Sequence, residues 1–84
     1  MIFIGDAADN YFEGHENRDS AAGRGGNDVL VGGSGNDELR GQLGDDNLDG
    51  GSGRTNFNNG GPGQDICARP APGEPGAVSC EAGP

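Results

Sequence analysis

Aspartate recurs at a fixed spacing through the middle of the chain. Asp19, Asp28, Asp37 and Asp46 are nine residues apart, and Asp65 continues the series after a longer gap. Carboxylate oxygens are ligands for hard divalent cations, and the short Asp side chain suits turns better than helix faces. The spacing therefore indicates a repeated cation site.

The composition supports a cation as the partner. The 84 residues include fourteen acidic and five basic side chains, which give a formal charge of -9. This charge argues against binding to nucleic acid or to an anionic membrane surface, and no apolar run is long enough for membrane insertion. Only 30% of the residues are hydrophobic and 19 are Gly, so composition alone favours disorder.

A strict nine-residue repeat argues against disorder. A Gly recurs every nine residues from Gly5 to Gly50. Cut at these glycines, the chain reads GDAADNYFE, GHENRDSAA, GRGGNDVLV, GGSGNDELR, GQLGDDNLD and GGSGRTNFN. A seventh unit, GGPGQDICA, follows one inserted residue, Asn59. The sixth column holds Asn10, Asp19, Asp28, Asp37, Asp46, Thr55 and Asp65. The eighth holds Phe12, Ala21, Leu30, Leu39, Leu48, Phe57 and Cys67. Residues 2–4 fit the end of a preceding unit, which suggests that the chain is the end of a longer array.

Each unit is expected to form a six-residue turn followed by a three-residue strand. Two helix-breaking glycines and a single apolar side chain do not give the spacing of an amphipathic helix. In a three-residue strand, by contrast, the middle side chain faces inward and its neighbours face outward. Two units make an eighteen-residue coil, and successive coils stack about 4.8 Å apart. The sequence therefore predicts an all-β fold, a parallel β-roll or solenoid.

Stacking brings residues eighteen apart to the same edge of the roll. One edge would carry Asn10, Asp28, Asp46 and, after the insertion, Asp65, and the other would carry Asp19, Asp37 and Thr55. Adjacent carboxylates would repel by roughly 3 to 4 kcal/mol at an effective dielectric near 20, so something cationic is needed between them. Two carboxylates with turn carbonyls form an all-oxygen cage, which suits Ca²⁺ better than Mg²⁺.

The units GRGGNDVLV, GGSGNDELR and GGPGQDICA resemble the Gly-Gly-x-Gly-x-Asp-x-U-x nonapeptide of RTX, or hemolysin-type, calcium-binding proteins. The resemblance covers about residues 2–68. It implies a parallel β-roll that holds Ca²⁺ between consecutive turns through sixth-column side chains and turn carbonyls. Asp19 would then pair with Asp37, and Asp28 with Asp46. Further candidate ligands are Asn10, Asp65 and the turn glycines Gly23, Gly26, Gly32, Gly35, Gly41 and Gly44.

Two departures from the repeat carry expectations of their own. Thr55 stands where the repeat has Asp, which predicts a weak or empty site beside Asp37. Asn59 shifts the phase before Asp65, which predicts a disturbed site between Asp46 and Asp65.

Residues 69–84 are expected to form an irregular cap on a roll spanning residues 2–68. This tail holds four prolines and has no nine-residue phase, and an uncapped roll would expose an unpaired edge. A bond between Cys67, in an inward column, and Cys80 would fold the tail over that edge and contribute about 3 kcal/mol. Two reduced thiols are the alternative. The disulfide implies an oxidising compartment, although the "MIFI" segment does not have the form of a signal peptide.

The expected function is calcium binding coupled to folding, in a secreted protein. About two carboxylates per site predict an affinity on the order of 0.1 to 1 mM, as in extracellular modules. The alternatives are a structural or adhesive spacer, or the C-terminal repeats of a larger secreted enzyme or toxin. We expect no enzymatic activity within these residues, because His15 is the only histidine and the chain has no lysine for a phosphate-binding loop.

Overall fold

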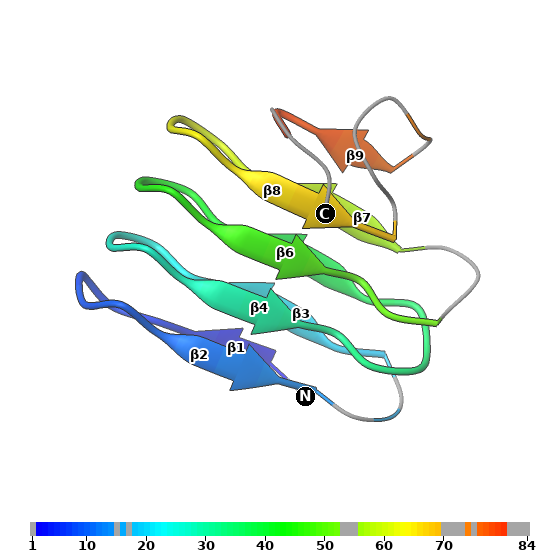
Figure 1. The fold of residues 1–84 in the computed structure, drawn as a ribbon. Helices are drawn as coiled ribbons and strands as arrows, with labels where there is room; N and C mark the ends of the chain where they lie inside the picture. The colour runs from blue at the N-terminus through cyan, green and yellow to red at the C-terminus, as the bar shows by residue number, and fades with distance from the viewer. Residues whose placement is uncertain are drawn as a thin grey trace.

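Three-residue strands alternate with turns along the chain, and the coils stack one above another (Figure 1). The computed structural model describes residues 2–14, 16, 18–52, 56–69, 74 and 76–80. The strands are β1 (Ile2–Ile4), β2 (Tyr11–Glu13), β3 (Ser20–Ala22), β4 (Val29–Val31), β5 (Glu38–Arg40), β6 (Asn47–Asp49), β7 (Phe57–Asn59), β8 (Ile66–Ala68) and β9 (Ala77–Val78). The predicted all-β parallel roll is confirmed. Across the described ranges, no helix has the length and apolarity needed to cross a membrane.

The strands form two parallel sheets that face each other. The odd-numbered strands pair in the order β1-β3-β5-β7-β9, and the even-numbered strands in the order β2-β4-β6-β8. Leu30 lies opposite Leu48 and Ala21 opposite Leu39, so partners are eighteen residues apart. Phe3 lies opposite Ala21, which confirms that residues 2–4 follow the same phase. The turns therefore collect along the two edges of the roll.

The core is a single row of inward side chains, one from each unit. Its buried members are Phe12, Ala21, Leu30, Leu39, Leu48 and Cys67, with Phe3 and Cys80 packed against them. Phe3 stacks on Phe12 with ring centroids 5.0 Å apart. Because a core this thin removes little apolar surface from water, the edges must also contribute to the stability of the roll.

The pairing of β7 corrects the predicted alignment of the sixth unit. Asn58 lies opposite Leu39. Asn56 therefore occupies the sixth column and Asn58 the eighth, and the prediction that gave these columns to Thr55 and Phe57 is wrong. Thr55 itself lies outside the described residues.

The extra residue of this unit is taken up in the turn before β7, and not at Asn59. Phe57 consequently faces outward and is half-buried, with the Arg40 guanidinium 5.6 Å from its ring centroid. Asn58 is fully buried, and its Nδ2 donates to the Ala68 carbonyl at 3.0 Å. The N–H₂ group of this buried amide is tolerated in the row because it has a hydrogen-bond acceptor.

The tail contains one strand that the sequence analysis did not anticipate. β9 pairs in parallel with β7 and extends the five-stranded sheet. Cys67 and Cys80 form a disulfide with their Cα atoms 5.8 Å apart, which confirms the predicted bond. β9 and Cys80 thus both lie against the last coil of the roll.

Candidate metal centre

The sixth-column side chains of one edge form a ladder. The Oδ1 atom of Asp28 accepts a hydrogen bond from the backbone N of Asn10 at 2.7 Å. Asp46 Oδ1 accepts in the same way from Asp28 N at 2.8 Å, and Asp65 Oδ1 from Asp46 N at 2.7 Å. The disturbance expected between Asp46 and Asp65 is not found, because the inserted residue is taken up before β7.

The opposite edge carries a shorter ladder of the same kind. Asp37 Oδ1 accepts from Asp19 N at 2.9 Å, and Asn56 Oδ1 accepts from Asp37 N at 2.8 Å. The structure therefore brings together the two pairs implied by the repeat, Asp19 with Asp37 and, on the first edge, Asp28 with Asp46. It adds Asn56, which the sequence analysis missed.

The second carboxylate oxygens are buried in a different environment. The side chains of Asp28, Asp37 and Asp46 are 1–3% exposed, and the Oδ2 atom of each has no hydrogen-bond partner among the residues that the structure describes. A buried acceptor in this state is costly unless a proton or a cation compensates it. Each ladder thus presents buried oxygens that are available to a cation.

Backbone carbonyls face the same spaces. A Cβ atom added at Gly60 would lie 2.5 Å from Asp65 Oδ2 and 2.5 Å from the carbonyl oxygen of Ser79 in the next coil. A Cβ added at Gly14 would lie 2.7 Å from the Gly32 carbonyl oxygen and would also overlap Asp19 Oδ2. The first-column glycine is therefore required at these turns, because a carboxylate oxygen and a carbonyl oxygen converge over it. Converging oxygens are the donor set of a hard cation such as Ca²⁺.

The other predicted glycines shape the turns. The fourth-column residues Gly26, Gly35 and Gly44 have φ values of 83°, 96° and 101°, which side chains disfavour. A Cβ on Gly44 would also overlap the carbonyl oxygen of Gly26. Gly23 and Gly41 in the first column lie against Asp28 and Asp46 respectively, like the two glycines described above.

Burial shifts the protonation of the ladder carboxylates. Desolvation raises the pKa of Asp46 to about 7, and the charges of Asp28 and Asp65 act in the same direction, while the hydrogen bond from the Asp28 amide opposes them. Desolvation also raises the pKa values of Asp28 and Asp37. These carboxylates are therefore hard to ionise without a compensating positive charge.

The longer ladder begins at Asn10. Asn10 accepts from the Asp6 backbone N at 3.1 Å through Oδ1 and donates to Asp6 Oδ1 at 3.3 Å through Nδ2. It therefore lies on the first ladder as predicted, but its amide has partners within its own turn. His15 lies outside the described residues.

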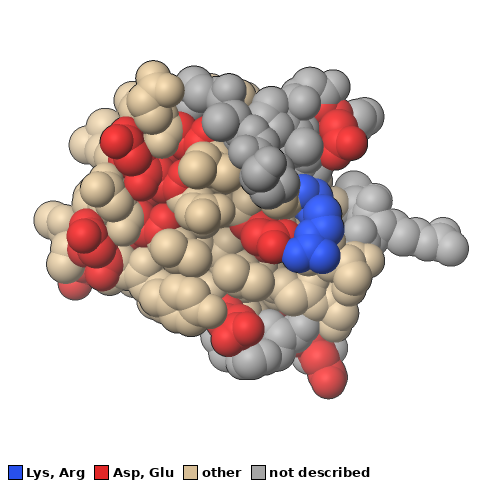
Figure 2. All heavy atoms as spheres, viewed as in Figure 1, with Lys and Arg blue, Asp and Glu red and all other residues tan. Residues whose placement is uncertain are grey.

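A further, more exposed series of hydrogen bonds, made by fifth-column side chains, runs beside the longer ladder. Asp9 Oδ1 accepts from Asn27 N at 2.7 Å, Asn27 Oδ1 from Asp45 N at 2.8 Å, and Asp45 Oδ1 from Gln64 N at 2.8 Å. These fifth-column residues were not among the predicted ligands, although a polar side chain recurs there about once in every coil. Figure 2 shows acidic side chains gathered on the side where the turns before β4, β6 and β8 lie in Figure 1.

Backbone oxygens must complete any site on these edges. In the part of the chain that the structure describes, no three His, Cys, Asp or Glu side chains gather as a metal-binding group. A site formed between coils would combine two sixth-column side chains with turn carbonyls. This combination of ligands fits calcium, which accepts six to eight oxygens in flexible geometry.

The fold and its two ladders define a parallel β-solenoid of the calcium-binding repeat class. Residues 22–55 match the family model of the RTX calcium-binding nonapeptide repeat, in four copies. RTX nonapeptide repeats bind Ca²⁺, and this match, together with the β-solenoid fold, supports a calcium-binding repeat module. The comparison with curated proteins gave no match, and the comparison with solved structures gave none either.

Proposed function

We propose that this module folds when it binds Ca²⁺ and that it acts, without catalysis of its own, in a secreted protein. The observation that carries the proposal is the set of buried Oδ2 atoms on Asp28, Asp37 and Asp46, for which the described part of the chain supplies no hydrogen-bond donor. In the folded chain these oxygens need a positive charge, and in the unfolded chain water solvates them. Calcium would supply that charge, so binding and folding are coupled.

The sites that we propose lie between Asp19 and Asp37 on one edge, and between Asp28 and Asp46 and between Asp46 and Asp65 on the other. Each combines two buried carboxylates with carbonyls of the adjoining turns. A fourth site, between Asn10 and Asp28, would have a single carboxylate and a weaker affinity. Four divalent ions would nearly cancel the formal charge of -9.

The proposed location follows from the affinity and the disulfide. Two carboxylates per site suit an affinity on the order of 0.1 to 1 mM, which extracellular calcium satisfies and cytosolic calcium does not. The disulfide between Cys67 and Cys80 also suits an oxidising compartment. The chain would stay expanded inside the cell and wind into the roll outside it.

Circular dichroism of the full chain in EDTA and in Ca²⁺ at about 5 to 10 mM, chosen from that affinity scale, tests the proposal. We expect a gain of β signal with Ca²⁺ and little gain with the same concentration of Mg²⁺. An Asp28→Asn, Asp37→Asn double variant should need more Ca²⁺ for the same signal. A chain whose β signal is equal in EDTA and in Ca²⁺ would overturn the coupling of folding to binding.

A further inference from the structure

The step between Asp37 and Asn56 differs from the step between Asp19 and Asp37 on the same edge. Asn56 is 7% exposed, and its Oδ1 accepts from Asp37 N at 2.8 Å. This bond repeats the one that Asp37 Oδ1 makes with Asp19 N. One half of the Asn56 side chain therefore does what an Asp does in the ladder.

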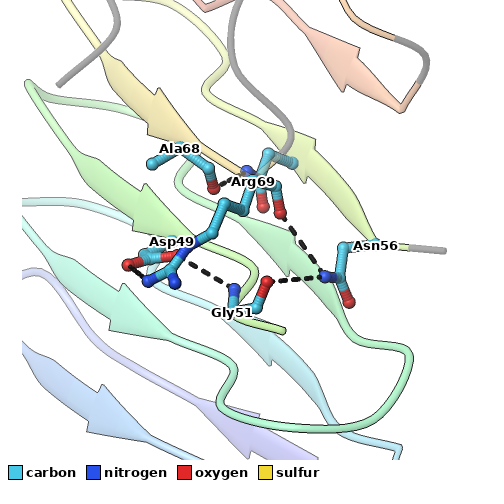
Figure 3. A network of polar contacts seen from close by, with 6 residues as sticks. Asp49, Gly51, Asn56, Ala68 and Arg69 are labelled. Carbon is cyan, nitrogen blue, oxygen red and sulfur yellow. Dashed lines mark hydrogen bonds and ion pairs between the residues drawn. The ribbon is translucent and has the colours of Figure 1, made fainter. Parts of the chain in front are cut away.

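The other half of the side chain has the opposite polarity. Asn56 Nδ2 donates long hydrogen bonds to the carbonyl oxygens of Gly51 and Arg69, each 3.4 Å away (Figure 3). A Cβ added at Gly50 would overlap the Arg69 carbonyl oxygen and would also approach Asn56, so this carbonyl is the counterpart of the Gly32 carbonyl that lies over Gly14 beside Asp19. At Asn56 an N–H₂ group faces the carbonyl, where an Asp unit places an oxygen.

The neighbouring charges are also compensated within the protein. The guanidinium of Arg69 binds both carboxylate oxygens of Asp49, with Nε to Oδ1 at 3.0 Å and a second nitrogen to Oδ2 at 2.5 Å. Asp49 Oδ1 further accepts from Gly51 N at 2.9 Å (Figure 3). Although burial acts to raise it, these bonds lower the pKa of Asp49. No cation is needed to hold this corner together.

We infer that the Asn56 amide takes the place of a cation between Asp37 and Asn56, so that this step binds no Ca²⁺ and the coil around it is ordered without the ion. The inference rests on the proposed function for the other steps only. An N–H₂ group directed at the carbonyls would repel a cation and would already satisfy them. The disulfide between Cys67 and Cys80 ties the same coil to the tail. This corner would therefore be the template on which the calcium-dependent coils wind.

Calcium titration calorimetry of the full chain and of Asn56→Asp tests the first half of the inference. Asn56→Asp restores a carboxylate beside Asp37, and we expect it to bind one more ion than the natural chain. Asn47→Asp is the matched control, because it adds the same charge at an exposed position of β6 and should leave the number of ions unchanged. Equal numbers of ions for the natural chain and for Asn56→Asp would overturn the inference.

Hydrogen exchange in EDTA tests the second half independently of calcium binding. We expect the Asn58 amide, which donates to the Gly76 carbonyl at 2.8 Å, to exchange about tenfold more slowly than the Asp28 amide. Asn56→Ala, which removes the donor without adding a carboxylate, should abolish this difference and leave the number of ions unchanged. Equally fast exchange of the two amides in the natural chain would overturn the inference, whereas a natural chain that binds no Ca²⁺ would overturn the proposed function instead.

Discussion

Replacing Asp46 by Asn should have opposite effects with and without calcium. Asp46 lies in the middle of the longer ladder, between Asp28 and Asp65, and is 2% exposed. An Asn at this position retains an Oδ1 acceptor for the Asp28 amide, as Asn56 does for Asp37. It removes only the charge and the second oxygen.

The size of the effect follows from the pKa of Asp46, which burial raises from 3.8 to about 7. At pH 8 the carboxylate is ionised, and the full pKa shift corresponds to a loss of about 4 kcal/mol in the stability of the calcium-free fold. Solvent screening at the edge of the roll reduces this loss to about 2 kcal/mol. Asp46→Asn should remove this cost and raise the ratio of folded to unfolded chain in EDTA about thirtyfold. With calcium, the loss of a carboxylate shared by two sites should weaken binding about tenfold.

Circular dichroism in EDTA at pH 8, followed by a calcium titration, measures both effects on one sample. Asp45→Asn is the matched control, because Asp45 is exposed in the adjacent column, where Asn27 already makes the same kind of hydrogen bond. That variant should change neither the signal in EDTA nor the calcium midpoint. If Asp46→Asn lowers the β signal in EDTA, burial of charge on the ladder is not what opposes folding without calcium.

Four further outcomes are expected. Because the ladder carboxylates have raised pKa values, the calcium-free fold binds more protons than the unfolded chain. Its β signal in EDTA should therefore be strongest near pH 4 and fall as the pH rises to about 7. A signal that grows over this range would contradict the raised pKa values. Leu39→Ala should lower the free energy of unfolding by about 2 to 5 kcal/mol, measured by urea denaturation in the presence of Ca²⁺, because Leu39 is fully buried. An unchanged urea midpoint would mean that the core row is loosely packed. Gly44→Ala should cost at least about 2 kcal/mol, because φ is 101° and its Cβ would overlap a carbonyl of the preceding coil; calcium titration should show a raised midpoint. A Cys67→Ser, Cys80→Ser variant should lose about 3 kcal/mol in the same melts, unless the tail stays docked without the bond.

The sequence predicts the parts of this protein that depend on spacing alone. The pairing of Asp28 with Asp46 and the inward row through Leu39 follow from an eighteen-residue coil, in which no other placement keeps Gly in the first column and an apolar residue in the eighth. The strand at residues 2–4 followed from the same arithmetic. These features need no knowledge of individual contacts.

The errors lie where one extra residue had to be placed. Phe57 fits an inward column by hydrophobicity better than Asn58 does, so the sequence favoured an alignment with Thr55 in the ladder. The structure buries Asn58, because the Ala68 carbonyl accepts a hydrogen bond from its amide, a partner that no local pattern reveals. β9 was missed because two residues in a Pro-rich tail carry no periodic signal.

The alternation of units between the two sheets gives the chain a parity. Odd and even units differ in which sheet they join and in which ladder they extend. Removing any eighteen consecutive residues of the repeat would shorten the stack by one layer and leave every later unit on its own side. Removing nine would transfer all later units, including the half of the disulfide at Cys67, to the opposite side of the stack. Gain or loss of coils in such a chain is therefore tolerable in pairs of units and disruptive in single ones.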